Sequence, residues 1–213
     1  MLGFCPIVAA PGRPPIRRDP GGPRTQDATP NARPMPLPPP APREHLHTRS
    51  VVCDGYRRDD GLFDLEARLL DTKSHAFSLM TGVRAPGEAV HDMWIRVTID
   101  REFTIHAVEA SIPAAPYPGG CQAIEPAYAK LVGANLVNGF RKAVKERLGG
   151  VHGCSHLTEL VGHLPTAAVQ TFAGLVPEDD GRHKPFQIDR CHALESSSDT
   201  VRRWYPKWYR GAA

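Results

Sequence analysis

Hydrophobic and polar residues alternate along several stretches between residues 48 and 110. Residues 63–71, with the sequence FDLEARLLD, place Phe63, Leu65, Ala67 and Leu69 on one side and charged residues on the other. A repeat of two residues is typical of a β-strand with one buried face. The alternation and the turn residues around it predict an antiparallel meander of about four strands, at residues 48–54, 62–72, 93–99 and 103–110. Between the first two strands, Asp-Asp-Gly at 59–61 is typical of a hairpin turn.

After residue 120 the spacing of the apolar residues changes to one typical of helices. Phe140, Val144 and Leu148 are spaced by four residues, as on the buried face of a helix. Strands followed by helices predict an α+β fold, in which the meander packs against three to four C-terminal helices. We expect Ser155 to cap one of these helices and Pro165 to kink or end it. The expected helical stretches are residues 124–132, 136–148, 155–164 and 166–175.

Composition separates the first 45 residues from the rest of the chain. Thirteen of the 22 prolines lie there. Such a segment buries too little apolar surface to offset the entropy of ordering it. We therefore expect residues 1–45 to be a disordered, proline-rich arm and residues 46–213 to form a single α+β domain. The alternative interpretation of the arm is an over-extended start, with the true start near Met35.

Charge and hydropathy exclude several classes of protein. The net charge is only +3, and basic residues are mixed with acidic ones, so we expect no nucleic-acid partner. No run approaches 18 apolar residues, and the apolar opening lacks the basic start of a signal peptide. We expect a cytoplasmic protein with no membrane partner, whose five cysteines are thiols, metal ligands or inert core residues rather than disulfides. A small-molecule substrate and a homo-oligomer are both compatible with the sequence.

The segment GCSHLTE at residues 153–159 carries the first candidate for chemistry. Cys154 precedes a predicted helix, where unpaired N–H groups favour a thiolate over a thiol. His156 and Glu159 are three residues apart and share a helix face, so they could serve as an acid/base and its orienting carboxylate. The structural alternative is a small buried cysteine beside two polar surface residues.

Two further segments carry candidate metal ligands. Cys121 follows two glycines and leads into a helix, and His91 with Asp92 stands at the start of a strand. A neutral imidazole is a ready ligand for transition metals, and a carboxylate can join it or orient it. We interpret Asp71 and the other charged residues of the first hairpin as a solvated sheet face. No motif of high specificity, such as HExxH or a P-loop, is present.

The chain shows two resemblances to known families. The segments RSVVCDGYRRDDGLFDLEARLLDTK, HDMWIRVTID, GCSHLTEL, CHAL and YPKWYR resemble a bacterial family called domain of unknown function 2889. This resemblance covers nearly all of residues 45–210 and implies no activity. The usual beginning of that family lies close to Met35.

Residues 87–170 are also similar to the iron–sulfur cluster scaffold fold of the NifU/IscU type. GEAVHDMWIRVTID, GGCQAI, LVGANLVNGF and GCSHLTEL stand where that fold carries its ligand loops. The resemblance implies that Asp92, Cys121 and Cys154 occupy ligand positions in one pocket at one end of the sheet. The first scaffold cysteine is missing, with His91 nearby, and Ala134 replaces the lysine of its Gly-Lys segment. Such a mixed set suits zinc or mononuclear iron at least as well as a cluster.

Our leading hypothesis is a metal-dependent enzyme, a lyase or hydrolase, that acts on a small molecule. In this hypothesis His91, Cys121 and Cys154 bind the metal with Asp92 as a further ligand, and His156 or Glu159 is the acid/base. One alternative is a carrier or scaffold for a metal or an iron–sulfur cluster. Another is a metal-free enzyme that uses Cys154, or His91 with Asp92. The last is a non-catalytic small-molecule-binding module, in which the aromatic tail at 204–209 covers a pocket or a partner.

Overall fold

The computed structural model describes residues 37–175 and 182–211 of the chain. Most of the arm that we expect to be disordered, residues 1–36, lies outside the described residues. Residues Glu44–Ala213 form one compact unit. Within the described part of the chain, no helix has the length and apolar character needed to cross a membrane.

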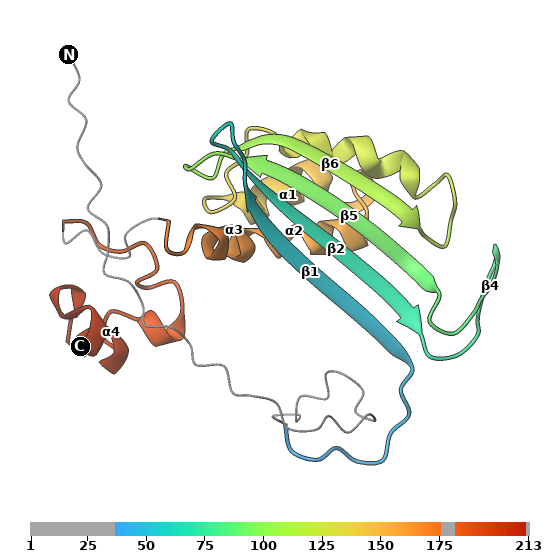
Figure 1. Ribbon diagram of the computed structural model, residues 1–213, viewed down its shortest axis with the longest axis horizontal. Coiled ribbons are helices and arrows are strands. Elements are labelled where there is room, and N and C mark those ends of the chain that lie inside the picture. The colour runs from blue at the N-terminus through green and yellow to red at the C-terminus, as the bar shows by residue number, and fades with distance from the viewer. Residues whose placement is uncertain (1–36, 176–181, 212–213) are drawn as a thin grey trace, which may run out of the picture. The chain divides into compact units, whose positions relative to one another are not determined.

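Four long strands form an antiparallel sheet, and their order in the sheet is β1-β2-β5-β6 (Figure 1). The predicted meander is therefore confirmed, and the bounds of its strands differ from the predicted ranges by up to four residues. A short hairpin, β3 with β4, is inserted between β2 and β5 and was not predicted. The strands are β1 (His47–Arg57), β2 (Phe63–Lys73), β3 (Phe77–Leu79), β4 (Gly82–Arg84), β5 (Ala89–Ile99) and β6 (Ile105–Ala114).

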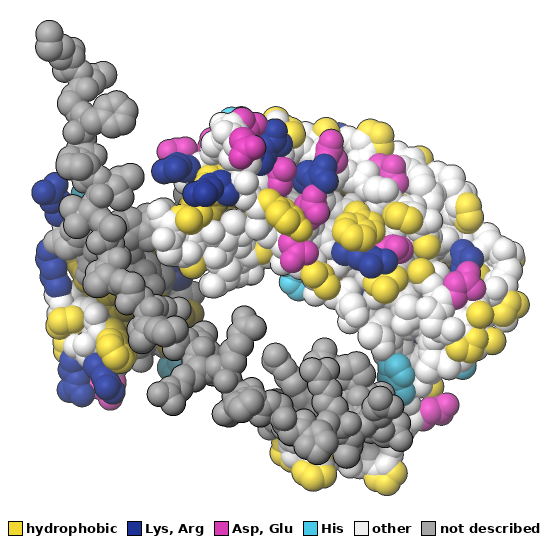
Figure 2. Space-filling view, viewed as in Figure 1, with side chains coloured by type: hydrophobic (Ala, Val, Ile, Leu, Met, Phe, Trp, Pro, Cys, Tyr) yellow, Lys and Arg dark blue, Asp and Glu magenta, His cyan; other side chains and the backbone are white. Residues whose placement is uncertain are grey.

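The two faces of the sheet have different surroundings. The alternating apolar residues of β2 and β5 are buried on one face, against the helices that follow the sheet in sequence. We call this the inner face. The other, outer face carries basic and acidic side chains next to each other, with scattered hydrophobic ones between them (Figure 2). This division follows from the repeat of two residues, since successive side chains of a strand point to opposite faces.

Helices cover the inner face and one edge of the sheet. The predicted α+β architecture, with several helices after the sheet, is confirmed. The helices before the gap are η1 (Gln122–Leu131), α1 (Phe140–Leu148), η2 (Gly150–His152), α2 (Ser155–Val161) and α3 (Leu164–Phe172). Those after the gap are η3 (His192–Leu194), α4 (Asp199–Trp204) and η4 (Pro206–Trp208).

Three details of the predicted helices are wrong. The stretch expected at 124–132 is a 3-10 helix that contains Pro126, a residue that lacks the N–H needed for a regular α-helical bond. The helix expected from residue 136 begins only at Phe140, because Gly139 adopts a left-handed conformation with φ of 71°. Pro165 lies in the first turn of α3 rather than ending α2, and proline is tolerated there because that N–H has no helical partner.

The start of α2 also differs from the prediction. Ser155 is the first residue of the helix, and Cys154 is the capping residue, without a side-chain hydrogen bond to the helix. The backbone of Cys154 is held instead by Tyr128 of η1, whose side chain is fully buried. The Tyr128 hydroxyl accepts a hydrogen bond from the Cys154 N–H at 3.0 Å and donates one to the Cys154 carbonyl at 3.0 Å. This contact sets the position of α2 against η1.

Candidate functional site

A row of polar side chains crosses three neighbouring strands at one end of the inner face. Arg49 of β1 lies opposite Asp71 of β2, which lies opposite His91 of β5. Residues that are opposite each other in adjacent strands point to the same face, so the three side chains form a continuous row. The row faces α2, from which His156 and Glu159 approach it.

Asp71 is the centre of this row and is only 3% exposed. Arg49 donates to both of its oxygens, from Nε to Oδ1 at 2.8 Å and from Nη2 to Oδ2 at 2.8 Å. His47 Nε2 lies 3.1 Å from Oδ1, and His91 Nδ1 lies 3.0 Å from Oδ2. A carboxylate offers about four acceptor positions, so these four contacts occupy all of them.

The charge of Asp71 is stabilised by these contacts. Burial by itself raises the pKa of this carboxyl, but the hydrogen bonds and positive charge of Arg49, aided by His47 and His91, lower it to about 2. Our prediction that Asp71 belongs to a solvated sheet face is therefore wrong. The signal that places it correctly is the repeat of two, because Asp71 continues the buried series that ends at Leu69.

The depressed pKa of Asp71 predicts a loss of stability in acid. Because its pKa in the folded protein is below the ordinary value of 3.8, the stabilisation is fully present above that ordinary value and is lost as pH falls through about 2. We expect this carboxyl to remove roughly 2 kcal/mol from the unfolding free energy of the metal-free protein between about pH 5 and pH 2. Urea unfolding at stepped pH measures it, and Asp71→Asn should lack this part of the pH dependence. An identical pH dependence in both proteins would contradict the assignment.

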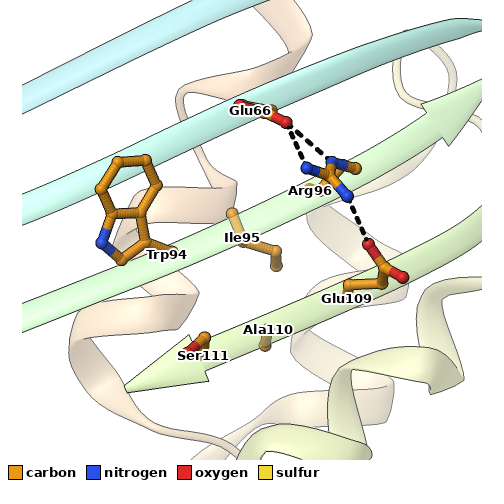
Figure 3. A pocket seen from close by; sticks show the side chains of 7 residues that line it. All are labelled: Glu66, Trp94, Ile95, Arg96, Glu109, Ala110 and Ser111. Atoms are coloured by element: carbon orange, nitrogen blue, oxygen red, sulfur yellow. Dashed lines mark hydrogen bonds and ion pairs between the residues drawn. The ribbon is translucent and has the colours of Figure 1, made fainter. Parts of the chain in front are cut away.

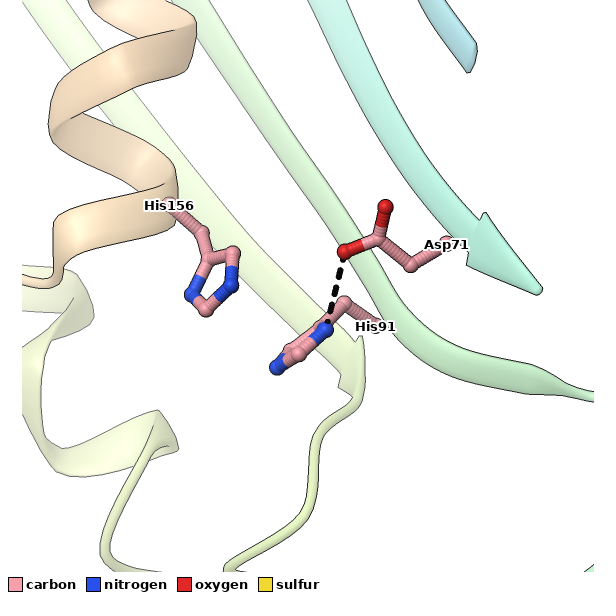
Figure 4. Close-up of side chains that lie close together, drawn as sticks. All are labelled: Asp71, His91 and His156. Carbon is pink, nitrogen blue, oxygen red and sulfur yellow. Dashed lines mark hydrogen bonds and ion pairs between the residues drawn. The ribbon is translucent and has the colours of Figure 1, made fainter. Parts of the chain in front are cut away.

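Two imidazoles lie next to each other beside Asp71 (Figure 4). The ring centroids of His91 and His156 are 3.9 Å apart, with an angle of 31° between the ring planes. Burial lowers the pKa of both histidines. The neighbouring His156 lowers the pKa of His91 further, and Arg49 lowers the pKa of His156 further. Asp71 acts in the opposite direction on both. Both rings are therefore neutral at pH 7. Since the Asp71 carboxylate can only accept, His91 donates from Nδ1, which leaves the lone pair of its Nε2 available.

His156 and Glu159 come from the same face of α2 but have different partners. Glu159 accepts from Arg49 Nη1 at 2.7 Å, and its side chain is about half exposed. Arg49 thus connects Asp71 on the sheet to Glu159 on the helix, and these two carboxylates raise its pKa, the Asp71 hydrogen bond most of all. The structure places Glu159 beside Arg49, whereas His156 stacks on His91.

A cavity of about 370 Å³ opens beside the two imidazoles. It lies between the end of β5, the loop before η1 and the segment that leads into α2. Its wall contains both rings and the two cysteines that the sequence singles out, namely His91, His156, Cys121 and Cys154. The structure thus brings together residues that are up to 65 positions apart in sequence.

The side chains closest to a common metal position are those of Asp71, His91 and His156. One ligand atom from each lies within 4.8 Å of the others, which makes them a possible metal-binding group. In the described part of the chain neither thiol joins this group, although both are free and partly buried in the cavity wall. The acceptor positions of Asp71 are occupied by Arg49 and the histidines. The two imidazoles are therefore the available ligands, and Asp71 is suited to orienting His91.

Unlike Cys121 and Cys154, the predicted ligand Asp92 does not line the cavity. It lies on the outer face, where Arg68 donates to both of its oxygens at 2.8 and 2.9 Å. Adjacent residues of a strand point to opposite faces, so His91 and Asp92 cannot both face the helices. Cys191 and His192, adjacent in sequence, lie in the segment after the gap, where Cys191 is exposed. Cys53 on β1 is partly buried, and burial raises the pKa of its thiol.

The outer face also carries a hollow, of about 270 Å³ (Figure 3). Trp94 forms one side of it, and Arg96 lies between Glu66 and Glu109. Arg96 forms ion pairs with both carboxylates, at 2.6 Å with Glu66 and 2.9 Å with Glu109. The two carboxylates outnumber the one guanidinium, and no histidine or cysteine of the described residues lines this hollow, so it lacks the neutral ligands found at the inner face.

Sequence reasoning missed Arg49, Asp71 and His47. Arg49 and His47 lie two residues apart on β1, so a repeat of two places them on one side. Nothing in the local sequence indicates that this side meets Asp71, because the pairing spans 22 and 24 residues. Only the register of the hairpin brings the three side chains together.

Comparison with known proteins gives one match. A family model described as "Protein of unknown function (DUF2889)" matches residues 47–170, a range that contains every residue of the site described above. Neither a curated protein nor a solved structure matches the chain. The match confirms the first resemblance seen in the sequence, whereas the resemblance to the NifU/IscU scaffold fold stays a prediction.

Proposed function

Because the chain belongs to the DUF2889 family, whose description supplies no activity, we propose a function from the site alone. The domain binds a divalent transition metal through His91 and His156 and acts on a small molecule in the adjacent cavity. The observation that supports this most directly is the hydrogen bond between His91 Nδ1 and the buried Asp71. It holds His91 in the tautomer whose Nε2 can bind a metal, next to a second neutral imidazole.

Zinc and iron are the metals that suit this set of ligands. Imidazole binds both, and the Cys121 and Cys154 thiols in the same cavity wall can add sulfur ligands. A bound metal with an open position polarises a carbonyl group or activates a water, which is the chemistry of a metal-dependent lyase or hydrolase. Arg49 and Asp71 orient His91, and Glu159 supports Arg49 from the helix. Because His156 is a metal ligand in this proposal, it does not serve as the acid/base that we expected from the sequence.

The test is a titration of chelator-treated full-length protein with Zn²⁺ and with Co²⁺. We expect one equivalent to bind, and the visible spectrum of Co²⁺ to report the geometry, with a charge-transfer band if a thiolate joins the site. His91→Ala and His156→Ala should each weaken binding by at least roughly 10- to 100-fold, because the loss of a group that only orients a metal ligand already has an effect of that size.

The control is His106→Ala, because His106 also pairs with a carboxylate, Asp100, at 2.8 Å, near the turn between β5 and β6 and thus at the opposite end of these strands from His91. It should bind metal like the unmodified protein. If Zn²⁺ and Co²⁺ do not bind, or if His106→Ala weakens binding as much as His91→Ala does, the proposed metal site is wrong.

A metal-free acid/base enzyme is the second candidate, and the same hydrogen bond between Asp71 and His91 favours it. A carboxylate behind an imidazole is the arrangement that orients a general base. The two proposals differ in the response of His91 to metal. In the acid/base enzyme, the NMR signals of the His91 ring stay unchanged when Zn²⁺ is added; in the metal enzyme they shift at one equivalent.

A further inference from the structure

We infer that the ligand of the inner-face cavity is a small, uncharged molecule with a hydrophobic, aromatic body. This inference rests on the proposed function only in assigning the cavity to a substrate, and it names the class of that substrate. It depends on three properties of the cavity: the residues in its wall, the absence of charge from that wall, and two hydrophobic side chains at its mouth.

The wall of the cavity is largely apolar. Met93 at its base is fully buried, and Ile124 of η1 adds a further hydrophobic surface. The polar side-chain groups in the wall are two imidazoles, two thiols and the hydroxyls of Ser155 and Tyr117. A concave, mainly apolar wall with a few polar groups at one side is typical of small-molecule sites, and a volume of about 370 Å³ is at the small end of their usual range.

No lysine, arginine, aspartate or glutamate of the described residues lines this cavity. The charges of the site, on Arg49, Asp71 and Glu159, pair with one another behind the imidazoles. In the metal-free protein, a charged ligand would lose part of its hydration on entering the cavity and would meet no oppositely charged side chain in its wall, which is unfavourable. An uncharged ligand avoids this cost.

Two exposed hydrophobic side chains flank the mouth of the cavity. Tyr117, in the loop before η1, is 65% exposed, and Val151, in η2, is 92% exposed. They come from segments that are more than 30 residues apart in sequence and line the same opening. A ligand seated between them would remove their apolar surface from water, and an aromatic ring would in addition stack on Tyr117. The mouth therefore favours a ligand with an aromatic body.

The experiment compares three probes of nearly equal size on metal-free, full-length protein: benzyl alcohol, benzoate and benzylammonium. Affinities come from chemical-shift changes of the backbone amides. We expect benzyl alcohol to bind at least about tenfold more tightly than either charged probe, with shifts at residues of the cavity wall. Val151→Ala and Tyr117→Ala should each weaken this binding by roughly two- to tenfold, because each removes apolar contact area.

A change of charge at the mouth provides the stricter test. Val151→Lys places a cation where the wall has none and should shift the preference towards benzoate. The control is Val52→Lys, because Val52 is an exposed valine on the outer face of β1, away from the cavity, and it should leave the preference unchanged. Because Val151 is almost fully exposed, its substitution leaves the core intact.

The outcomes separate this inference from the metal proposal. Equal affinities, a preference for a charged probe, shifts outside the cavity or no binding of any probe would overturn the inference, even if Zn²⁺ binds as expected. Conversely, selective binding of benzyl alcohol in a protein that binds neither Zn²⁺ nor Co²⁺ would support the ligand class and reject the metal.

Discussion

Asp71→Asn is expected to lower the free energy of unfolding by about 3 kcal/mol, because removal of one partner from a buried ion pair leaves the other uncompensated. Asp71 is buried and accepts from Arg49 with both oxygens. An asparagine would turn an NH₂ group towards the donors of Arg49 or His91. The expected loss is at the low end of the range for such pairs because Arg49 is 30% exposed and keeps its contact with Glu159. Chemical denaturation followed by circular dichroism measures the change.

The chain offers a matched control in Asp92→Asn. Asp92 also accepts from an arginine of the neighbouring strand, Arg68, with both oxygens, but on the outer face of the sheet. Arg68 is 37% and Asp92 16% exposed, so solvent screens this pair and its loss should cost less than about 1 kcal/mol. Equal effects of the two substitutions would show that burial of Asp71 does not determine its contribution.

Tyr128→Phe is expected to lower the free energy of unfolding by roughly 2–3 kcal/mol and to loosen the cavity wall at Cys154. The hydroxyl is the acceptor for the Cys154 N–H and lies 3.0 Å from the Thr158 hydroxyl. Phenylalanine keeps the ring packing but leaves these partly buried polar groups without their partner, which is the costly way to lose a hydrogen bond. The same loss frees the residue that precedes α2, so alkylation of Cys154 in metal-free protein should become faster.

Tyr56→Phe is the control for this substitution. Tyr56 lies on β1 and is 49% exposed, so water replaces any contact of its hydroxyl. We expect a change below about 0.5 kcal/mol and an unchanged alkylation rate. If Tyr128→Phe alters stability without altering the alkylation of Cys154, then the Tyr128 hydroxyl stabilises the fold but does not hold the cavity wall.

The site has two parts, a rigid floor formed by the sheet and a more open wall formed by loops. Asp71, Arg49 and His91 are joined by hydrogen bonds across three paired strands, so the floor has little freedom to move. The opposite wall consists of loops and 3-10 segments, in which Val151 and Tyr117 are exposed. Substitutions in the floor should therefore act on stability and on the orientation of His91. Substitutions at the mouth should act on the choice of ligand.

The strands were predictable because alternation is a local property of the chain. The buried series of β2, from Phe63 to Leu69, can be read directly from the sequence, and it extends to Asp71. The helices were less predictable. Gly139 and Pro126 change the local backbone within stretches whose apolar spacing still looks helical, so the type and the bounds of those helices differ from the prediction.

In the candidate site, too, some residues could be predicted from the sequence and others could not. His91, His156, Cys121 and Cys154 could be named from residue type and from their place at the ends of elements, and all four line one cavity. For Asp92, the alternation around Met93 already indicates the outer face. Its place beside His91 and the resemblance to a scaffold fold nevertheless made it a predicted ligand. For Asp71, its charge argued for solvent, whereas its actual environment depends on an arginine 22 residues away.

Local sequence thus decides which residues of this protein form strands and which side chains share a face, because the backbone geometry of a strand is the same wherever it occurs. Tertiary structure alone decides that the buried end of β2 receives an arginine from β1, an imidazole from β5 and a second imidazole from α2. Those contacts span up to 85 residues between Asp71 and His156. They arise from strand register and helix packing, which are properties of the whole fold and not of any segment of the sequence.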